Sequence, residues 1–144
     1  MKINYKELAK SILVPLVCGG IVALLTKPGA SYQGMIQPTF APPGFIFPIA
    51  WSILYILMGI SNYLSPSNSY YFSQLIVNLL WSFIFFTFKC YLFAFIWIIL
   101  LIILVILMMT EYYKTNKTSF YLQIPYLLWL IFAAVLNYSI FILN

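Results

Sequence analysis

The sequence predicts an all-α, polytopic membrane protein: a single domain, residues 1–144, built as a bundle of five transmembrane helices. Apolar residues make up 65% of the chain and charged residues only 6%. The apolar residues fall into about five runs long enough to cross a bilayer core roughly 30 Å thick. No run alternates apolar and polar side chains, as the strands of a membrane barrel do. Helices are therefore the spanning structure that the pattern supports.

The first predicted span covers residues 7–26. It contains Pro15, which should loosen or kink the helix. Gly19, Gly20 and Ala23 form a small-residue face on which another helix can pack closely.

Residues 27–42 form the first predicted loop, which is far longer than the other connections. It is rich in proline and glycine, yet it carries Tyr32, Met35, Ile36 and Phe40. Loops of this length in compact proteins are usually functional or disordered. The apolar residues indicate that this loop folds onto the bundle as a lid.

Four further spans are predicted after the loop. Pro43 suits the first turn of the second span, where its missing N–H costs nothing. Pro48 is expected to kink that helix, and Pro125 lies near the start of the last one. The predicted bounds of these spans are residues 43–64, 70–87, 92–113 and 119–143.

The charges predict the orientation of the bundle. All seven basic residues are lysines; five fall on the side of the N-terminus and two, Lys27 and Lys89, on the other side. The positive-inside rule then places the N-terminus in the cytoplasm, with loop 27–42 and the C-terminus outside. The lysines form no stripe, so binding of nucleic acid is not expected.

The composition favours Lys, Ile, Asn, Phe and Tyr, and Lys is the only basic residue. This bias is typical of an AT-rich bacterial genome. In a bacterium, a multi-pass protein of this kind is expected in the cell membrane.

The few polar residues of the spans locate the interior, because polar side chains in lipid point into the bundle or toward a cavity. Helical spacing gives each of three spans one face that mixes aromatic, amide and small residues. These faces are Trp51, Tyr55, either Met58 or Gly59, and Asn62 on the second span, Gln74, Asn78 and Trp81 on the third, and Trp129, Ala133, Leu136 and Asn137 on the fifth.

Two interpretations of these faces remain open. In the first, aromatic rings fill space and the amides hydrogen-bond between helices, for roughly 1 kcal/mol each. The tryptophans could also be residues of the interfacial aromatic belt. In the second, the mixture of amides, indoles and small residues is the wall of a pocket for a flat hydrophobic ligand.

Conventional catalysis is not indicated. The chain contains no His, Asp or Arg, and its only acids are Glu7 and Glu111. No acid–base pair, catalytic triad or metal-ligand cluster can be assembled from these residues, and Cys18 and Cys90 are expected to be free thiols. We expect no metal site and no required cofactor. An aromatic macrocycle would bind as an organic ring, without ligation of its metal.

Three segments resemble the translocator protein family, also called tryptophan-rich sensory proteins or peripheral-type benzodiazepine receptors. They are QPTFAPPGFIFPIAWSILYILMGISNYL at 37–64, QLIVNLLWSFIFF at 74–86 and PYLLWLIFAAVLNY at 125–138. The resemblance implies five transmembrane helices, a homodimer in the bilayer, and a cavity beneath the first loop that binds porphyrins and synthetic aromatic ligands. It makes Trp51, Trp129, Ala133 and Leu136 pocket walls and Asn78 the amide that bonds a ligand carbonyl. Trp81 matches a family tryptophan; Tyr55 joins the candidates by its helical spacing.

The chain departs from the family pattern at several positions. Phe40 and Phe45 stand where the family prefers tryptophan, which keeps the ring and loses the N–H donor. Trp97 replaces an acidic residue on the fourth span, with Phe93 at an aromatic position before it, so a role that needs a charge there is not expected. No basic residue follows Tyr138, so cholesterol recognition is not predicted.

The predicted function is a membrane receptor, sensor or translocator that binds porphyrin-like tetrapyrroles and other flat hydrophobic ligands under the first loop. One alternative is an enzyme that degrades porphyrin with light and oxygen, as proposed for some family members. Trp51 and Trp129 would then be redox partners, and the protein would supply position and confinement. A second alternative is a membrane scaffold with an incidental pocket.

Overall fold

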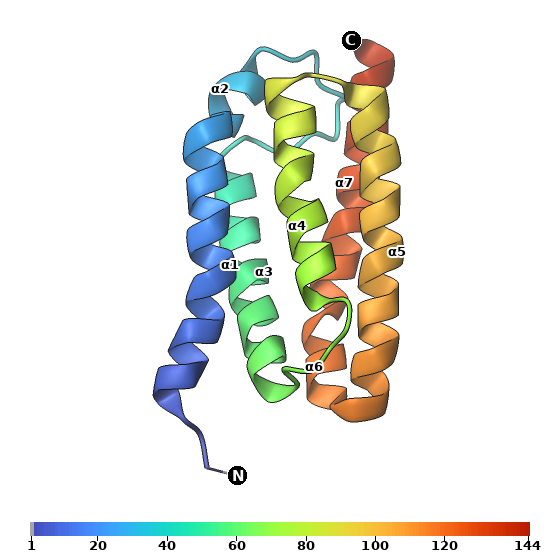
Figure 1. Ribbon diagram of the computed structural model, residues 1–144. Helices are drawn as coiled ribbons and strands as arrows, with labels where there is room; N and C mark the ends of the chain where they lie inside the picture. The colour runs from blue at the N-terminus through green and yellow to red at the C-terminus, as the bar shows by residue number, and fades with distance from the viewer. Residues whose placement is uncertain (1) are drawn as a thin grey trace.

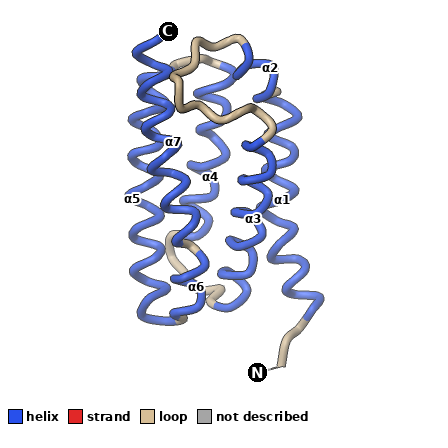
Figure 2. The backbone as a smooth tube through the Cα atoms, turned by 180° about the vertical axis from the view of Figure 1, so that it is seen from behind, coloured by secondary structure: helices blue, strands red, loops and turns tan. Residues whose placement is uncertain are grey.

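The computed structural model describes residues 2–144, which contain seven α-helices, one π-helix and no β-strand (Figures 1 and 2). Four segments are long and apolar enough to cross a membrane: α1, α3, α5 and the segment that joins α6 to α7; α4 with η1 forms a shorter apolar helix. The prediction of an all-α membrane bundle of five helices is confirmed. The elements are α1 Tyr5–Thr26, α2 Pro28–Gln33, α3 Ile46–Leu64, α4 Tyr71–Ser82, η1 Phe83–Thr87, α5 Tyr91–Thr115, α6 Lys117–Leu122 and α7 Ile124–Leu143.

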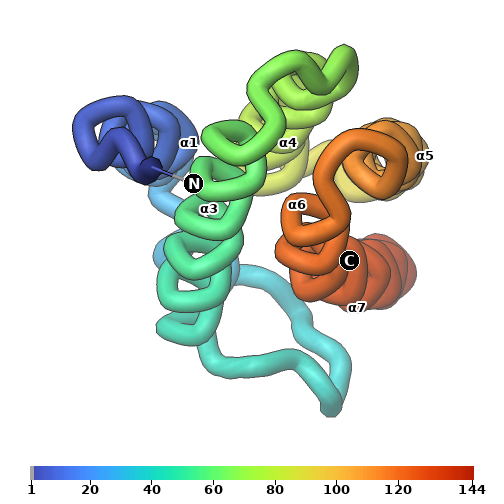
Figure 3. The backbone as a smooth tube through the Cα atoms, turned by 90° about the horizontal axis from the view of Figure 1, so that it is seen from below, coloured from blue at the N-terminus to red at the C-terminus, as the bar shows by residue number. Residues whose placement is uncertain are grey.

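The five spans form a closed ring rather than a row. Helix α1 packs on α3, α3 on α6, α6 and α7 on α5, α5 on α4, and α4 on α1 (Figure 3). At the end where α2 lies, aromatic side chains of α3 meet those of α7: the Phe47 and Trp129 ring centroids are 5.9 Å apart, and those of Trp51 and Trp129 6.4 Å. The loop that follows α2 and the C-terminus lie at this end, and the N-terminus at the opposite one (Figure 1).

Two helix boundaries differ from those expected from the sequence. Helix α3 begins at Ile46, so Pro43 precedes the helix and its carbonyl accepts from the N–H of Ile46 at 3.1 Å. Pro48 therefore falls in the first turn, where a proline interrupts no helical hydrogen bond. The last span is broken at Gln123, whose side-chain amide donates to the hydroxyl of Ser61 on α3 at 2.6 Å.

The close approach of α1 and α3 depends on glycine. A Cβ atom at Gly59 would collide with the backbone of α1 at Ser11 and Ile12. The hydroxyl of Ser11 also donates to the carbonyl of Gly59 at 2.6 Å. On the predicted small-residue face of α1, Gly19 lies against the ring of Tyr55, whereas no neighbour lies within 4 Å of a Cβ built at Gly20.

The first loop is fastened to the bundle at separate points. The Ser31 hydroxyl donates to the carbonyl of Phe86 at 2.9 Å, in the π-helical segment that ends α4. Ile36 and Asn144 exchange two hydrogen bonds, at 3.1 and 2.9 Å, between the loop backbone and the Asn144 side chain. The loop also contains the short helix α2, which the sequence did not predict. These contacts hold the loop over the end of the ring where the aromatic residues gather.

Candidate functional site

A chain of buried polar side chains crosses the middle of the bundle. The hydroxyl of Tyr55 donates to the side-chain oxygen of Asn78 at 2.7 Å. The Asn78 amide nitrogen donates to the hydroxyl of Tyr126, also at 2.7 Å, and that hydroxyl donates to Gln74 at 2.8 Å. Four side chains from α3, α4 and α7 thus provide one another with hydrogen-bond partners. Such a network ties three helices together without any charged group.

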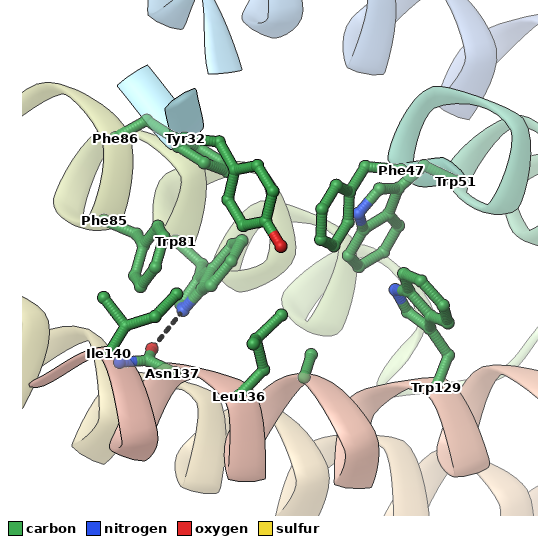
Figure 4. A pocket seen from close by; sticks show the side chains of 11 residues that line it. Tyr32, Phe47, Trp51, Trp81, Phe85, Phe86, Trp129, Leu136, Asn137 and Ile140 are labelled. Atoms are coloured by element: carbon green, nitrogen blue, oxygen red, sulfur yellow. Dashed lines mark hydrogen bonds between the residues drawn. The ribbon is translucent and has the colours of Figure 1, made fainter. Parts of the chain in front are cut away.

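Above this chain, toward the loop, lies a small central cavity (Figure 4). It leaves only about 20 Å³ for the centre of a water-sized sphere. Aromatic rings fill most of the remaining space: Trp81 stacks on Phe85 with centroids 4.8 Å apart, and the Trp81 N–H donates to Asn137 at 3.1 Å. The sequence led us to expect a hollow between the second, third and fifth spans. The structure shows that this region is largely packed, because Phe47, Phe85 and Phe86 occupy it.

A much larger side pocket lies between α1, α3 and the α4–η1 segment, under the loop. It leaves about 610 Å³ for the centre of a water-sized sphere, compared with about 20 Å³ in the central cavity. Its wall on α1 is made of small or short residues, among them Gly19, Ala23 and Thr26. Trp51 and Tyr55, stacked with centroids 5.6 Å apart, form part of the α3 wall. A volume of this size is typical of sites for small organic ligands.

An aromatic partition separates the two cavities. Tyr32, Phe47, Trp51 and Phe86 line both of them. The ring of Tyr32, from the loop, meets Phe47 edge-on at 4.9 Å, and its hydroxyl donates to the carbonyl of Pro42 at 2.8 Å. Burial raises the pKa of the Tyr32 phenol above its usual value, so the hydroxyl stays a donor. Tyr32 therefore belongs both to the loop that covers the bundle and to the partition between the two cavities.

The structure brings together most of the residues singled out from the sequence. Trp51, Trp81, Trp129, Ala133 and Leu136 line the central cavity, and Tyr55 lines the side pocket. Trp81 is buried, and Trp51 and Trp129 pack against the core, so these tryptophans face inward and do not form a belt. Asn78 is different: it is 3% exposed, lines neither cavity, and has both ends of its amide engaged by Tyr55 and Tyr126.

Sequence reasoning missed the contribution of α1 to the site. It predicted the loop as a lid, but it did not single out Tyr32 as a residue that lines both cavities. The α1 residues of the side pocket are small or short and mostly apolar, so in the sequence they resemble an ordinary helix-packing face. Phe47 could have been found, because it stands one turn before Trp51 on the same face of α3. Phe85 could also have been found, because it stands one turn after Trp81. Phe86 follows it in the π-helix η1, which helical spacing did not predict.

The site is suited to binding a neutral, ring-shaped molecule. No charged residue lines either cavity, and within residues 2–144 no group of three or more His, Cys, Asp or Glu side chains could hold a metal ion. Its polar groups are indole N–H, phenol, amide and hydroxyl groups, which are chemically able to form hydrogen bonds with a ligand.

Comparison with known proteins gives a consistent result over nearly the whole chain. The family model described as the TspO/MBR family matches residues 11–143. The tryptophan-rich protein TspO of Archaeoglobus fulgidus is 37% identical, over 98% of this chain and 99% of that protein. Protein CrtK of Rhodobacter capsulatus is 32% identical, over 91% and 89%. The translocator protein of Homo sapiens is 27% identical, over 76% and 72%.

Proposed function

The chain belongs to the TspO/MBR family of membrane proteins, and from that premise we propose that it binds a porphyrin or a similar flat hydrophobic ligand in the side pocket beneath its first loop. The bound ligand is either sensed or passed across the membrane. The observation that carries the proposal is the side pocket itself, with about 610 Å³ of space beside the stacked rings of Trp51 and Tyr55.

Three properties of the pocket support a planar aromatic ligand. Its α3 wall offers ring faces, which attract other rings in offset or edge-on arrangements. Its α1 wall is flat because Gly19 and Ala23 carry almost no side chain. Burial of apolar surface provides the main driving force, at about 25 cal/mol per Å², and no charged group of the pocket has to be desolvated.

The proposal is tested by titrating purified protein in detergent with protoporphyrin. Ala23→Phe would fill the side pocket and is expected to weaken binding at least tenfold, because the ligand and the new ring compete for one space. Leu24→Phe is the matched control: Leu24 is the next residue on α1, is 78% exposed and does not line the pocket. Equal affinity of the two variants would contradict binding in the side pocket.

A light-dependent enzyme is a second candidate function. The ring centroids of Trp51 and Trp129 lie 6.4 Å apart; Trp51 lines the side pocket, and Trp129 lies behind it on the central cavity. In this scheme an illuminated porphyrin activates oxygen, which oxidises the pigment, and the indoles act as redox partners. Illumination of the complex in air should then bleach protoporphyrin more slowly in Trp51→Phe and Trp129→Phe. Bleaching at the wild-type rate in both variants would remove this candidate.

Two further parts of the proposal come from the family resemblance and from the charges. The protein forms a homodimer in the bilayer, which crosslinking in native membranes would detect as a species of twice the monomer mass. Its N-terminus lies in the cytoplasm, and its loop and C-terminus lie outside.

A scaffold with an incidental pocket would instead bind no porphyrin at any concentration reached in the titration.

A further inference from the structure

Several buried side-chain polar atoms have no hydrogen-bond partner within residues 2–144, and most of them gather at one end of the bundle. Four belong to residues near the N-terminal end: the oxygen of Asn62, the hydroxyls of Tyr71 and Tyr112, and the oxygen of Gln123. Buried polar groups in proteins are almost always hydrogen-bonded, because a group without a partner is unfavourable. Four such atoms at one end of a small bundle therefore indicate a partner from outside the chain.

These four residues come from neighbouring segments and lie at a similar depth. Asn62 is two residues before the end of α3, and Tyr112 is three residues before the end of α5. Tyr71 begins α4, and Gln123 joins α6 to α7. Seen from this end, α3, α4, α5 and α6 lie around one interior (Figure 3).

The polar atoms face that interior and not the lipid. Tyr71 and Gln123 are each 1% exposed, and Tyr112 is completely buried. A residue on the outer face is much more exposed, as the neighbouring Phe72 is at 57%. Asn62 is half-buried as a residue, but its side-chain oxygen is buried. The four groups therefore converge on the space between the helices.

The break in the last span holds Gln123 in this position. Its amide nitrogen donates to the hydroxyl of Ser61 at 2.6 Å and lies 3.4 Å from the carbonyl oxygen of Leu57. The Ser119 hydroxyl donates to the carbonyl of Ser61 at 3.0 Å, which fastens α6 to α3. The amide nitrogen is thus committed to α3, and the amide oxygen is left as an acceptor in the interior.

The chemistry of the four groups matches water better than an ion. A phenol hydroxyl needs an acceptor for its proton, whereas an amide oxygen needs a donor. Water supplies both, and a buried water typically makes two to four such bonds. A metal cation would leave the phenol protons without an acceptor, and its burial would require a negative charge. Glu111, the acid next to Tyr112, is instead bonded to the backbone and hydroxyl of Ser69.

We propose that the N-terminal end of the bundle contains an internal water site, in which a cluster of water molecules bridges the two phenols and the two amides. The site is separate from both cavities, since none of its four residues lines either of them. The buried chain from Tyr55 to Gln74 lies between it and the central cavity. A hydrophobic ligand that moved along the bundle axis toward the N-terminal end would therefore meet polar groups and water.

The first test removes one hydroxyl at a time. Tyr71→Phe and Tyr112→Phe keep the ring and delete a group that holds water. Each variant should unfold in detergent about 2–4 °C below wild type, because a hydrogen bond is lost. Tyr121→Phe, at an exposed position near the same end, is the control and should unfold with wild type. A midpoint at or above that of wild type for Tyr71→Phe or Tyr112→Phe overturns the site, since deleting a hydroxyl that lacks a partner favours the folded state.

The second test detects the water in the unmodified protein. Nuclear Overhauser contacts between water and side-chain amide protons are measured in micelles, on protein labelled with nitrogen-15 at asparagine and glutamine. The Gln123 amide should contact a long-lived water. Asn78 is the matched control, because its amide is also buried and also donates to a hydroxyl, that of Tyr126, but both of its ends are engaged by protein. Proton exchange through hydroxyl groups would affect both amides.

The two measurements must agree for the site to stand. A lack of water contact at Gln123, or equal contact at Gln123 and Asn78, overturns it even when the phenylalanine variants unfold at lower temperature. Neither measurement uses a porphyrin, so the result is independent of the test of the proposed function.

Discussion

At the scale of single residues, the helical spacing of the sequence located the inward-facing tryptophans correctly but could not distinguish a ligand contact from a structural one. Trp51, Trp81 and Trp129 lie where the three mixed faces placed them. Asn78 belongs to the same pattern, yet both ends of its amide are hydrogen-bonded to the phenol groups of Tyr55 and Tyr126. The difference depends on the rotamers of Tyr55 and Tyr126, which periodicity does not encode.

Asn78 therefore has a structural role that can be measured. Asn78→Ala would leave the hydroxyl of Tyr55 without its acceptor and that of Tyr126 without a donor in the bundle interior. We expect a loss of about 1–2 kcal/mol in the free energy of unfolding, seen as a lower thermal midpoint in detergent. Ser52→Ala is the control: Ser52 is exposed and bonds only to the carbonyl of Pro48 in its own helix. An unchanged midpoint in Asn78→Ala would contradict this role.

At the scale of elements, the sequence predicted an all-α membrane bundle of five helices, because long apolar runs leave few alternatives in a bilayer. It could not predict η1 or α2. The π-helix depends on one extra residue in the last turn of the third span, where the N–H of Phe88 bonds to the carbonyl of Phe83 at 2.9 Å. Helix α2 depends on tertiary contacts such as that of Ser31 with Phe86. Neither feature leaves a periodic pattern.

The contact of α1 with α3 gives a prediction at this scale. Gly59→Ala should push α1 away from α3, because the new methyl group meets backbone that cannot turn aside. The expected loss of unfolding free energy is about 1–3 kcal/mol, again measured by thermal unfolding in detergent. Gly20→Ala makes the same chemical change at a position with open space around it. It should be neutral or slightly stabilising, since alanine favours a helix. Equal midpoints for the two variants would show that the helices do not need this glycine.

At the scale of the whole molecule, the two ends of the bundle differ in charge and in structure. The N-terminal end carries Glu7, Glu111 and five lysines, whereas the end with the loop carries only Lys27 and Lys89. The site lies beneath the weakly charged end. By the positive-inside rule, we propose that this end faces the outside of the cell.

Labelling of the Cys90 thiol can test this orientation, because Cys90 is exposed at the end of the bundle that carries the loop. In a Cys18→Ser background, a membrane-impermeant maleimide added to intact cells should label Cys90. A cysteine introduced in place of Lys2, at the opposite end, should react only after the cells are opened. The reverse pattern of labelling would overturn the proposed orientation.

The lack of charge in both cavities has a kinetic consequence. Nothing in the site can attract an ionic solute over a distance, so uptake should be insensitive to ionic strength. The supply of ligand would be governed by its partition coefficient between water and the surrounding lipid or micelle. Dissociation constants for this protein are then comparable between preparations only when written as mole fractions in the amphiphile phase.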